Sequence, residues 1–308
     1  MKKLTVRVPG SSANLGPGFD TLALAYELYC TLTFELGEDG FENGPIVEVE
    51  GSGAASLPCD ENNLVLKVLE EHFPGLKSQF KKLKVTIKSE IPLARGLGSS
   101  AACIAGTVWA GIYLTGQTPD RKTALQYAAS IEGHPDNVAA SLFGALTASA
   151  YVKQTKDFVA ATVEWPVEWR PILVVPDREV STAHARAVLP KKVSMPEAVS
   201  NIQNTALLLM AIEKRDRELL RAGLADCLHE PHRQALIPEL QEVKNILRDS
   251  PVLGVVLSGA GSSILVLSEA RHVDYVKSEL ESWSSVREGK VKVMSLEVDR
   301  EGLAATYG

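Results

Sequence analysis

The sequence predicts an α+β fold in two domains, and three observations carry this prediction. The chain has 308 residues, a length typical of two domains of about 100–200 residues each. Its character changes after Tyr151, where two Trp and two Pro residues interrupt the pattern over 165–171. The last part, about 60 residues long, runs through strand, helix and strand patterns, as in an α+β sandwich. We expect the domains to span residues 1–160 and 161–308.

The composition is that of an ordinary globular protein, and it excludes several classes. Lys and Arg total 32 against 38 Asp and Glu, a net charge of −6, so no general positive field attracts nucleic acid or an anionic membrane. The four Cys residues are far apart and form no Cys-x-x-Cys pair, which argues against a zinc ribbon or a disulfide framework. The first ten residues hold two lysines but no apolar run, unlike a signal peptide. We expect a reducing cytoplasm as the compartment.

The first domain is expected to begin with strands. Residues 4–8 alternate apolar and polar side chains, which indicates a strand that Pro9 and Gly10 should end. A loop of small residues is expected over 11–20. Asn63–Phe73 has apolar residues at helical spacing with an Asn at its start, which predicts a helix. Further strands are expected at 30–36, 46–50 and 82–88, the last with the clearest alternation.

The remaining elements follow the same patterns. Asp120–Ile131 is expected to form a helix with Thr118 or Asp120 near its cap. Apolar residues at helical spacing predict helices at 196–213, 216–229, 238–248 and 271–282. Strands are expected at 172–175, 254–257, 264–267 and 291–296.

From Gly96 to Pro119 the sequence contains no charged residue, which raises the question of a membrane span. The segment holds five glycines and several Ser, Thr and Gln side chains, whereas a spanning helix is normally rich in Leu, Ile, Val and Phe. We interpret it as a glycine turn followed by a helix of small residues that is buried on all sides. No membrane partner is expected.

The strongest local motif is Pro-Leu-Ala-Arg-Gly-Leu-Gly-Ser-Ser-Ala-Ala over 92–102, between a strand and a helix. Gly96 and Gly98 permit a tight turn and a close approach of the backbone to a ligand. A helix beginning near Ser99 directs free N–H groups and the positive end of its dipole to the same place. These features suit a triphosphate. The alternative is a tight turn in which serine caps a core helix.

Two other nucleotide motifs fit this segment poorly. A Walker A loop needs a Lys after the glycines, and none follows here. The dinucleotide fingerprint matches only if Ala101 replaces its third Gly. It also lacks the acidic residue expected about 20 positions further on, since 107–119 contains none and Asp120 belongs to the next segment.

A second cluster, Glu132-Gly-His-Pro-Asp-Asn137, contains two carboxylates, an imidazole and an amide around a proline. Magnesium bound to a nucleotide needs hard oxygen ligands near the phosphates. Ser100 and Glu132 can supply them if the two segments meet. The alternative is an Asx turn between helices, in which Asp136 or Asn137 caps the next helix.

Two further loops combine small residues with close-approach glycines. One is Pro9–Asp20, which holds an amide and a carboxylate right after a strand, and the other is Ser258–Ser263, between two apolar strands. Either of them, taken alone, is typical of a turn rather than a site.

Taken together, the four segments resemble the GHMP small-molecule kinases, the family of galactokinase, mevalonate kinase and homoserine kinase. The resemblance extends over nearly the whole chain. The glycine-serine loop is a feature of the whole family, whereas the opening loop, Ser181–Pro190 and His229–Pro238 indicate the subgroup that acts on homoserine. The fold implied is an N-terminal domain like ribosomal protein S5 and a C-terminal ferredoxin-like α/β sandwich.

The resemblance implies where the co-substrate ATP binds. The triphosphate would lie on the glycine-serine loop, with Asn63 near the adenine, and Ser100 and Glu132 would hold Mg²⁺. The ATP-binding residues implied are Asn63, Pro92, Leu93, Ala94, Arg95, Gly96, Leu97, Gly98, Ser99, Ser100, Ala101 and Ala102.

It also implies a site for homoserine, a zwitterion with a terminal hydroxyl. Arg186 and Arg233 suit the carboxylate, because a guanidinium binds it bidentately, and Asp20 suits the ammonium. The substrate-binding residues implied are Asn14, Asp20, His134, Asn137, Thr182, Arg186, Arg233 and Gly261. The catalytic residues expected are Asn137, Glu132 and Arg186.

The reaction implied is phosphoryl transfer from ATP to the hydroxyl of L-homoserine, giving O-phospho-L-homoserine for threonine biosynthesis. Phosphoryl transfer depends on positioning and charge neutralisation more than on a strong base. We therefore expect direct in-line attack assisted by Mg²⁺ and the helix terminus, with Asn137 positioning the substrate. Whether Asp136 or Asn137 faces the acceptor hydroxyl stays open. We hypothesise that Asn137→Ala slows turnover and that Asp136→Asn chiefly weakens the fold.

Two alternatives are another kinase of the family, acting on a mevalonate-like or sugar alcohol, and a non-catalytic member that binds a metabolite. Arg186, Arg233 and Asp20 argue against an uncharged sugar, and the retained Ser100 and Glu132 argue against a non-catalytic role.

One position departs from the family pattern. Ser262 follows Gly261 where Pro is usual, which restores an N–H donor and is expected to loosen the loop. Relatives are often homodimers, but no feature of this sequence indicates the oligomeric state.

Overall fold

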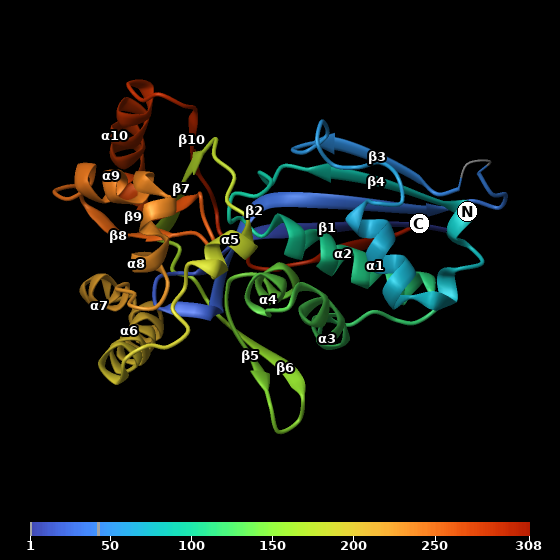
Figure 1. The fold of residues 1–308 in the computed structure, drawn as a ribbon, viewed down its shortest axis with the longest axis horizontal. Coiled ribbons are helices and arrows are strands. Elements are labelled where there is room, and N and C mark those ends of the chain that lie inside the picture. The colour runs from blue at the N-terminus through green and yellow to red at the C-terminus, as the bar shows by residue number, and fades with distance from the viewer. Residues whose placement is uncertain (1, 42–43) are drawn as a thin grey trace.

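The computed structural model describes residues 2–41 and 44–308, and it contains two β-sheets with helices packed on them (Figure 1). A seven-stranded sheet is built mainly from the first half of the chain, and a four-stranded sheet from the second half. Helices and largely antiparallel sheets are combined in both parts. The predicted α+β architecture is therefore confirmed.

The first sheet has the order β11-β1-β2-β4-β3, and β5 pairs with both β2 and β6. β3 and β4 run parallel, and the other pairs run antiparallel. Its strands are β1 (Lys2–Asn14), β2 (Gly18–Leu36), β3 (Ile46–Gly51), β4 (Leu83–Ser89), β5 (Leu146–Val152), β6 (Asp157–Val163) and β11 (Ala304–Tyr307). In β4 alternate side chains are buried, as its sequence pattern predicts.

Four helices cover one face of this sheet (Figure 1). They are α1 (Leu64–His72), α2 (Ser99–Leu114), α3 (Arg121–Glu132) and α4 (Asp136–Phe143). Side-chain caps start two of them: Asn63 accepts from the N–H of Val65, and Asp120 accepts from the N–H of Thr123. α2 and α4 lie directly on β1 and β2.

The second sheet has the order β10-β7-β9-β8, all antiparallel. Its strands are β7 (Trp169–Pro176), β8 (Val252–Leu257), β9 (Ile264–Glu269) and β10 (Val291–Ser295). α9 (Pro238–Ile246) and α10 (Val273–Ser285) pack on it. The remaining helices are α5 (Thr182–Ala187), α6 (Met195–Lys214), α7 (Arg217–Gly223) and α8 (Glu230–Arg233).

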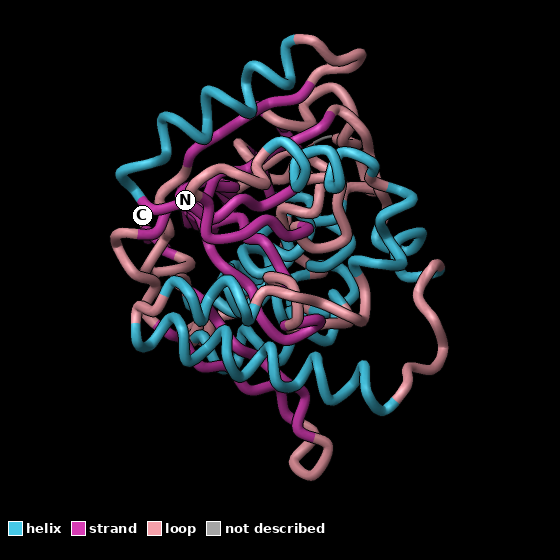
Figure 2. Tube along the Cα trace, turned by 90° about the vertical axis from the view of Figure 1, so that its left-hand side faces the viewer, coloured by secondary structure: helices cyan, strands magenta, loops and turns pink. Residues whose placement is uncertain are grey.

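The end of the chain returns to its beginning. β11 pairs with β1, so the two termini lie side by side (Figures 1 and 2). β6 crosses residue 160 and belongs to the first sheet. The division of the chain at residue 160 stays a prediction.

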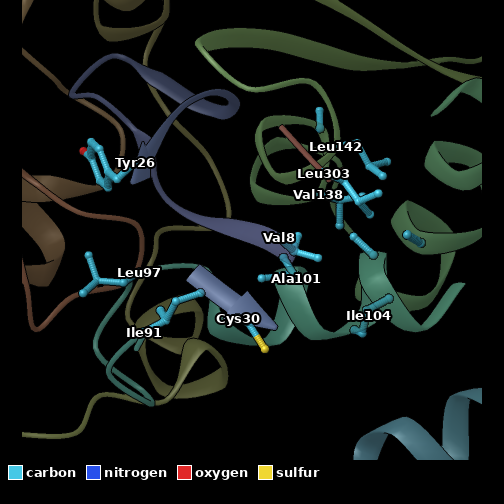
Figure 3. Close-up of a cluster of buried hydrophobic side chains, with 14 of the residues drawn as sticks. Val8, Tyr26, Cys30, Ile91, Leu97, Ala101, Ile104, Val138, Leu142 and Leu303 are labelled. Carbon is cyan, nitrogen blue, oxygen red and sulfur yellow. The ribbon is translucent and has the colours of Figure 1, made fainter. Parts of the chain in front are cut away.

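The uncharged run forms α2, which is buried over most of its surface. Figure 3 shows Ala101 and Ile104 of this helix in the same apolar cluster as Val8 of β1. Glycine is needed where the packing is closest, because a Cβ on Gly106 would lie 2.7 Å from the Leu32 side chain. Within the residues described, none of the helices has the length and apolarity to cross a membrane.

Two expected elements are wrong. The segment 11–20 is not mainly a loop, because β1 continues to Asn14 and β2 starts at Gly18. Register shifts after Pro9 and after Ala13 let the paired strands continue past the proline. The expected helix 216–229 ends at Gly223, because the Asp226 carboxylate turns the chain by accepting the N–H groups of Leu228, His229 and Glu230.

Other elements were not predicted at all. They are α5, α8, β5, β6 and β11, which are short or carry mixed polar and apolar sequences, whereas a helix at the position of α4 entered only through the Asx-turn alternative. The other expected strands and helices are confirmed within a few residues at their ends, with two exceptions: the strand at 4–8 continues past Pro9 to Asn14 in β1, and the strand at 30–36 is the last part of the much longer β2.

Candidate functional site

A cavity of about 120 Å³ collects side chains from segments that are far apart in the sequence. Its walls come from the ends of β1 and β2, the turn before α2, the junction of α3 and α4, α5, α8 and the loop after β8. α5 lies between the two sheets (Figure 1). The predicted residues that line the cavity are Asn14, Asp20, Pro92, Ala94, Arg95, Gly96, Leu97, Gly98, Ser99, Ser100, Glu132, His134, Asn137, Thr182, Arg186 and Arg233.

The turn before α2 has the backbone that its sequence predicts. Gly96 and Gly98 have φ angles of 72° and 69°, a region that favours glycine. The Ser258 hydroxyl donates to the carbonyl of Gly96 at 2.6 Å, so the loop after β8 holds the turn in place. The N–H groups of Ser99, Ser100 and Ala101 begin α2 and so have no acceptor within the helix. Ser99 and Ser100 line the cavity. This is a site suited to an anion.

Arg95 belongs to this turn, but its side chain is occupied by the protein itself. Its guanidinium donates to the carbonyls of Leu93 and Pro176 and pairs with Asp177 at 3.1 Å and Glu179 at 3.4 Å. Arg95 therefore ties the turn to the end of β7. Its predicted contact with ATP stays a prediction.

Ser100 and Glu132 meet, as the magnesium prediction requires. The Ser100 hydroxyl donates to Glu132 Oε2 at 3.0 Å. Burial raises the pKa of Glu132 above its ordinary value, and the nearby His134 opposes this effect. A partly buried carboxylate and a neighbouring hydroxyl together offer the hard oxygen ligands that fit Mg²⁺. Within the described residues no three or more His, Cys, Asp or Glu side chains are arranged so that together they could hold a metal ion, so phosphate oxygens and water would complete the coordination.

The junction of α3 and α4 brings three polar side chains together. Asp136 is buried, and its Oδ1 accepts from the N–H of Asn137 at 2.7 Å and contacts His134 Nδ1 at 3.0 Å. The hydrogen bond to Asp136 raises the pKa of His134. Asn137 Nδ2 donates to the carbonyl and hydroxyl of Ser11. Asp136 and Asn137 both line the cavity, so the question of which one faces the acceptor stays open.

Asp20 and Arg186 form a two-point ion pair across the cavity. Arg186 Nη1 and Nη2 lie 3.0 and 2.7 Å from the two carboxylate oxygens. Asn14 holds Asp20, because its Oδ1 accepts the Asp20 N–H at 3.1 Å while its Nδ2 donates to the carbonyl of Gly259. The hydrogen bonds to Asp20 raise the pKa of Arg186. Opposite charges are therefore present at one place in the site.

Arg233 lines the same cavity as Arg186 and is only 2% exposed. Its Nε donates to the carbonyl of Ala185 at 3.1 Å, and its Nη1 donates to the carbonyl of Gly259 at 3.0 Å. Burial, followed by the positive charge of Arg186, lowers the pKa of Arg233 to about 10, so the side chain remains charged at neutral pH.

A second, mostly apolar cavity of about 430 Å³ adjoins the first and shares Ala94, Ser99 and Ser100 with it. Leu57, Leu64, Ile87 and Leu93 contribute apolar walls. Such a space suits a flat heterocycle. Asn63 also lines it, but the Asn63 amide is used for the cap of α1 and for the carbonyl of Pro58.

Some predicted residues lie elsewhere. Ala101 and Ala102 belong to α2, are fully buried in the core, and line neither cavity. Gly261 also lies outside both cavities, and its neighbours Gly259 and Ala260 form that wall instead. Ser262 is buried, and its hydroxyl donates to the carbonyl of Arg178. This bond anchors the position where the family usually has Pro.

Sequence reasoning missed Phe19, which lines the cavity next to Asp20. An aromatic residue directly before the predicted ammonium ligand was the available signal. Val180 was missed as well.

Comparison with known proteins places the chain in a family. Residues 63–145 match the GHMP kinases N terminal domain, and residues 208–284 match the GHMP kinases C terminal domain. The chain is 36% identical over 301 residues to the homoserine kinase of Nostoc punctiforme, covering 97% of each chain. It is 39% identical over 275 residues to the homoserine kinase of Caldanaerobacter subterraneus, covering 89% of this chain and 86% of that one.

Solved structures agree with this assignment. The crystal structure of homoserine kinase from Cytophaga hutchinsonii matches with a TM-score of 0.85 and 26% identity over 99% of this chain and 97% of that one. A mevalonate diphosphate decarboxylase from Enterococcus faecalis shares the fold, with a TM-score of 0.72 and 14% identity over 100% and 99% of the two chains. The predicted two-domain fold is confirmed, and the chain belongs to the GHMP kinase family.

Proposed function

We propose that this kinase transfers the γ-phosphoryl group of ATP to the side-chain hydroxyl of L-homoserine. The products are ADP and O-phospho-L-homoserine. The observation that carries the proposal is that the carboxylate of Asp20 and the guanidiniums of Arg186 and Arg233 line one cavity beside the anion-binding turn. A zwitterionic amino acid needs such a set, whereas an uncharged sugar does not. The homoserine kinases that match nearly the full chain support the same substrate.

The ion pair between Asp20 and Arg186 suits exchange with the substrate. When homoserine enters, its ammonium can replace Arg186 beside Asp20, and its carboxylate can replace Asp20 beside Arg186. Each protein charge then keeps a partner, so binding leaves no ion uncompensated. The terminal hydroxyl, two carbons further along, is directed toward the turn that precedes α2.

In the transfer itself the chain acts mainly by positioning. The hydroxyl oxygen attacks the γ-phosphorus as the bond to the bridging oxygen of ADP breaks, and the hydroxyl proton leaves with solvent or phosphate. Asn137, fixed by its bonds to Ser11, holds the acceptor in line. The first N–H groups of α2 stabilise negative charge on the phosphates. Ser100 and Glu132 would hold Mg²⁺, which supplies charge neutralisation when bound.

An acceptor panel tests this function. We expect ADP release with L-homoserine, with a kcat/KM about 100-fold or more above that for mevalonate or galactose. Mevalonate lacks the ammonium group and galactose lacks both charges, so either acceptor leaves a charged side chain of the site without its partner. A coupled ADP-release assay measures this. Release with another alcohol and none with homoserine would contradict the substrate and leave the kinase class standing. The homodimer and the cytoplasmic compartment stay predictions.

The adjacent residues Asp136 and Asn137 are expected to respond differently to substitution. Asn137→Ala should slow kcat about tenfold or more, because it removes the amide that holds the acceptor together with its two hydrogen bonds to Ser11. Asp136→Asn should chiefly lower stability, by about 1–3 kcal/mol, because a buried acceptor next to His134 is weakened. Steady-state kinetics and thermal unfolding measure the two effects. An Asp136→Asn protein that melts normally but has lost turnover would assign the acceptor contact to Asp136 instead.

A further inference from the structure

Phe19 and His229 lie behind the two arginines of the cavity, and the proposed function gives them no role. Phe19 is partly buried at the start of β2, and His229 is fully buried just before α8. Their rings are stacked, with centroids 5.1 Å apart and planes 23° apart. They come from segments more than 200 residues apart, so this contact is made only in the folded chain.

The hydrogen bonds of His229 define its protonation state. Arg233 Nη1 lies 3.3 Å from His229 Nδ1, and a guanidinium can only donate, so Nδ1 must accept. The proton is therefore on Nε2, which donates to the carbonyl of Gly16 at 2.9 Å. The imidazole is neutral in this arrangement. Burial lowers the pKa of His229, although Asp226, whose carboxylate lies 3.6 Å from Nε2, opposes the effect.

Arg233 is held on several sides, and one side remains open. Its Nε and Nη1 are engaged by Ala185, Gly259 and His229. Among the residues that the structure describes, its Nη2 makes no hydrogen bond to the protein, and the residue lines the cavity. The N–H groups of Nη2 are thus the ones left for an anionic ligand.

The Phe19 ring touches both guanidiniums. Arg233 Cζ lies 5.4 Å and Arg186 Cζ lies 5.7 Å from its centroid. The face of an aromatic ring attracts cations, and here it adjoins two positive charges that would otherwise repel each other. The ring also supports the imidazole that accepts from Arg233.

We propose that Phe19 and His229 are positioning residues, which form an aromatic platform that fixes Arg233 and so selects acceptors that carry a carboxylate. This inference rests on the proposed function, with Arg233 beside Arg186 as the second guanidinium that binds the carboxylate of homoserine. The platform touches no reacting atom, so its loss should weaken acceptor binding much more than nucleotide binding.

Two substitutions of His229 separate its two hydrogen bonds. In His229→Asn the side-chain oxygen can stand at the place of Nδ1 and accept from Arg233. In His229→Gln the longer side chain can place its amide at Nε2 and donate to Gly16, but the acceptor for Arg233 is lost. We expect His229→Gln to raise the KM for homoserine about 10- to 100-fold. The KM for ATP should change less than about threefold in both variants, and the rise in KM for homoserine should be smaller in His229→Asn.

A second pair tests the ring of Phe19. Phe19→Leu removes the aromatic face and should raise the KM for homoserine about tenfold. Phe19→Tyr keeps the aromatic face, so its KM for homoserine should stay close to that of the unchanged chain. Melting temperatures and the KM for ATP are measured for all four variants. A role confined to stability would change melting temperature without a selective change in the KM for homoserine.

The outcomes distinguish the two proposals. If the unchanged chain does not phosphorylate homoserine, the proposed function fails and the platform inference fails with it. If the unchanged chain is active but His229→Gln and Phe19→Leu keep a normal KM for homoserine, only the platform inference is contradicted. Equal rises in the two KM values would also overturn it. If His229→Gln does not fold, the Phe19 pair still decides.

Discussion

Glu132→Gln is expected to lower kcat by about 100-fold or more and to remove most of the dependence of turnover on Mg²⁺. The amide has nearly the same size and can still accept from the Ser100 hydroxyl, so the local packing is preserved. It lacks the negative charge that suits a hard divalent cation. Steady-state kinetics over a magnesium titration measure the effect.

The same substitution should raise stability when magnesium is absent. Burial raises the pKa of Glu132 above its ordinary value of 4.5, so the folded protein binds this proton more tightly than the unfolded chain does. Stability therefore falls as pH rises from the unfolded to the folded pKa, and it stays lowered at neutral pH. Glutamine carries no charge, so the Glu132→Gln protein does not lose this stability at neutral pH. Thermal unfolding at neutral pH, with and without Mg²⁺, tests the sign.

Glu71→Gln is the matched control, because Glu71 is an exposed carboxylate on α1. It should change neither turnover nor melting temperature appreciably. If Glu132→Gln kept normal turnover and a normal magnesium dependence, the assignment of Glu132 to the metal would be wrong.

Gly96→Ala is expected to have the second large effect, a loss of nucleotide binding together with about 2–4 kcal/mol of stability. A Cβ on Gly96 would lie 2.2 Å from the carbonyl oxygen of Ser258 and 2.8 Å from the N–H nitrogen of Gly261. These are backbone atoms of the loop that holds the turn, so neither segment can yield without breaking their contact. Calorimetric titration with an ATP analogue and thermal unfolding measure the two losses.

Gly116→Ala separates the backbone strain from this clash. Gly116 has a φ of 87°, similar to the 72° of Gly96, but a Cβ there meets nothing within 4 Å. It should therefore show only the conformational penalty of about 1 kcal/mol with normal nucleotide binding. Equal effects of the two substitutions would contradict a close contact at Gly96.

Local patterns predicted those elements whose sequence is strongly periodic. Strand β4 and helices α1, α3 and α6 follow from alternation, helical spacing and caps. The continuation of β1 through Pro9 and Gly10 could not be read in this way. It depends on pairing with β2, a contact between strands that forms only when the whole sheet assembles.

The candidate site shows the same division. The turn before α2 and the pair of Ser100 and Glu132 could be predicted, because glycine spacing and hard oxygen ligands are visible in the letters. The contacts of Arg95 could not be predicted, since its long side chain can reach either a phosphate or a neighbouring strand. The fold turns it toward Pro176 and Asp177.

The sequence by itself determined the family and the glycine turn before α2, because both depend on residue types at short spacing within single segments. Only the tertiary structure decided how charges from distant segments meet. The pairing of Asp20 with Arg186, and the stacking of Phe19 on His229 behind Arg233, join segments separated by more than 160 residues. Such contacts arise from the packing of whole elements, which no local pattern specifies.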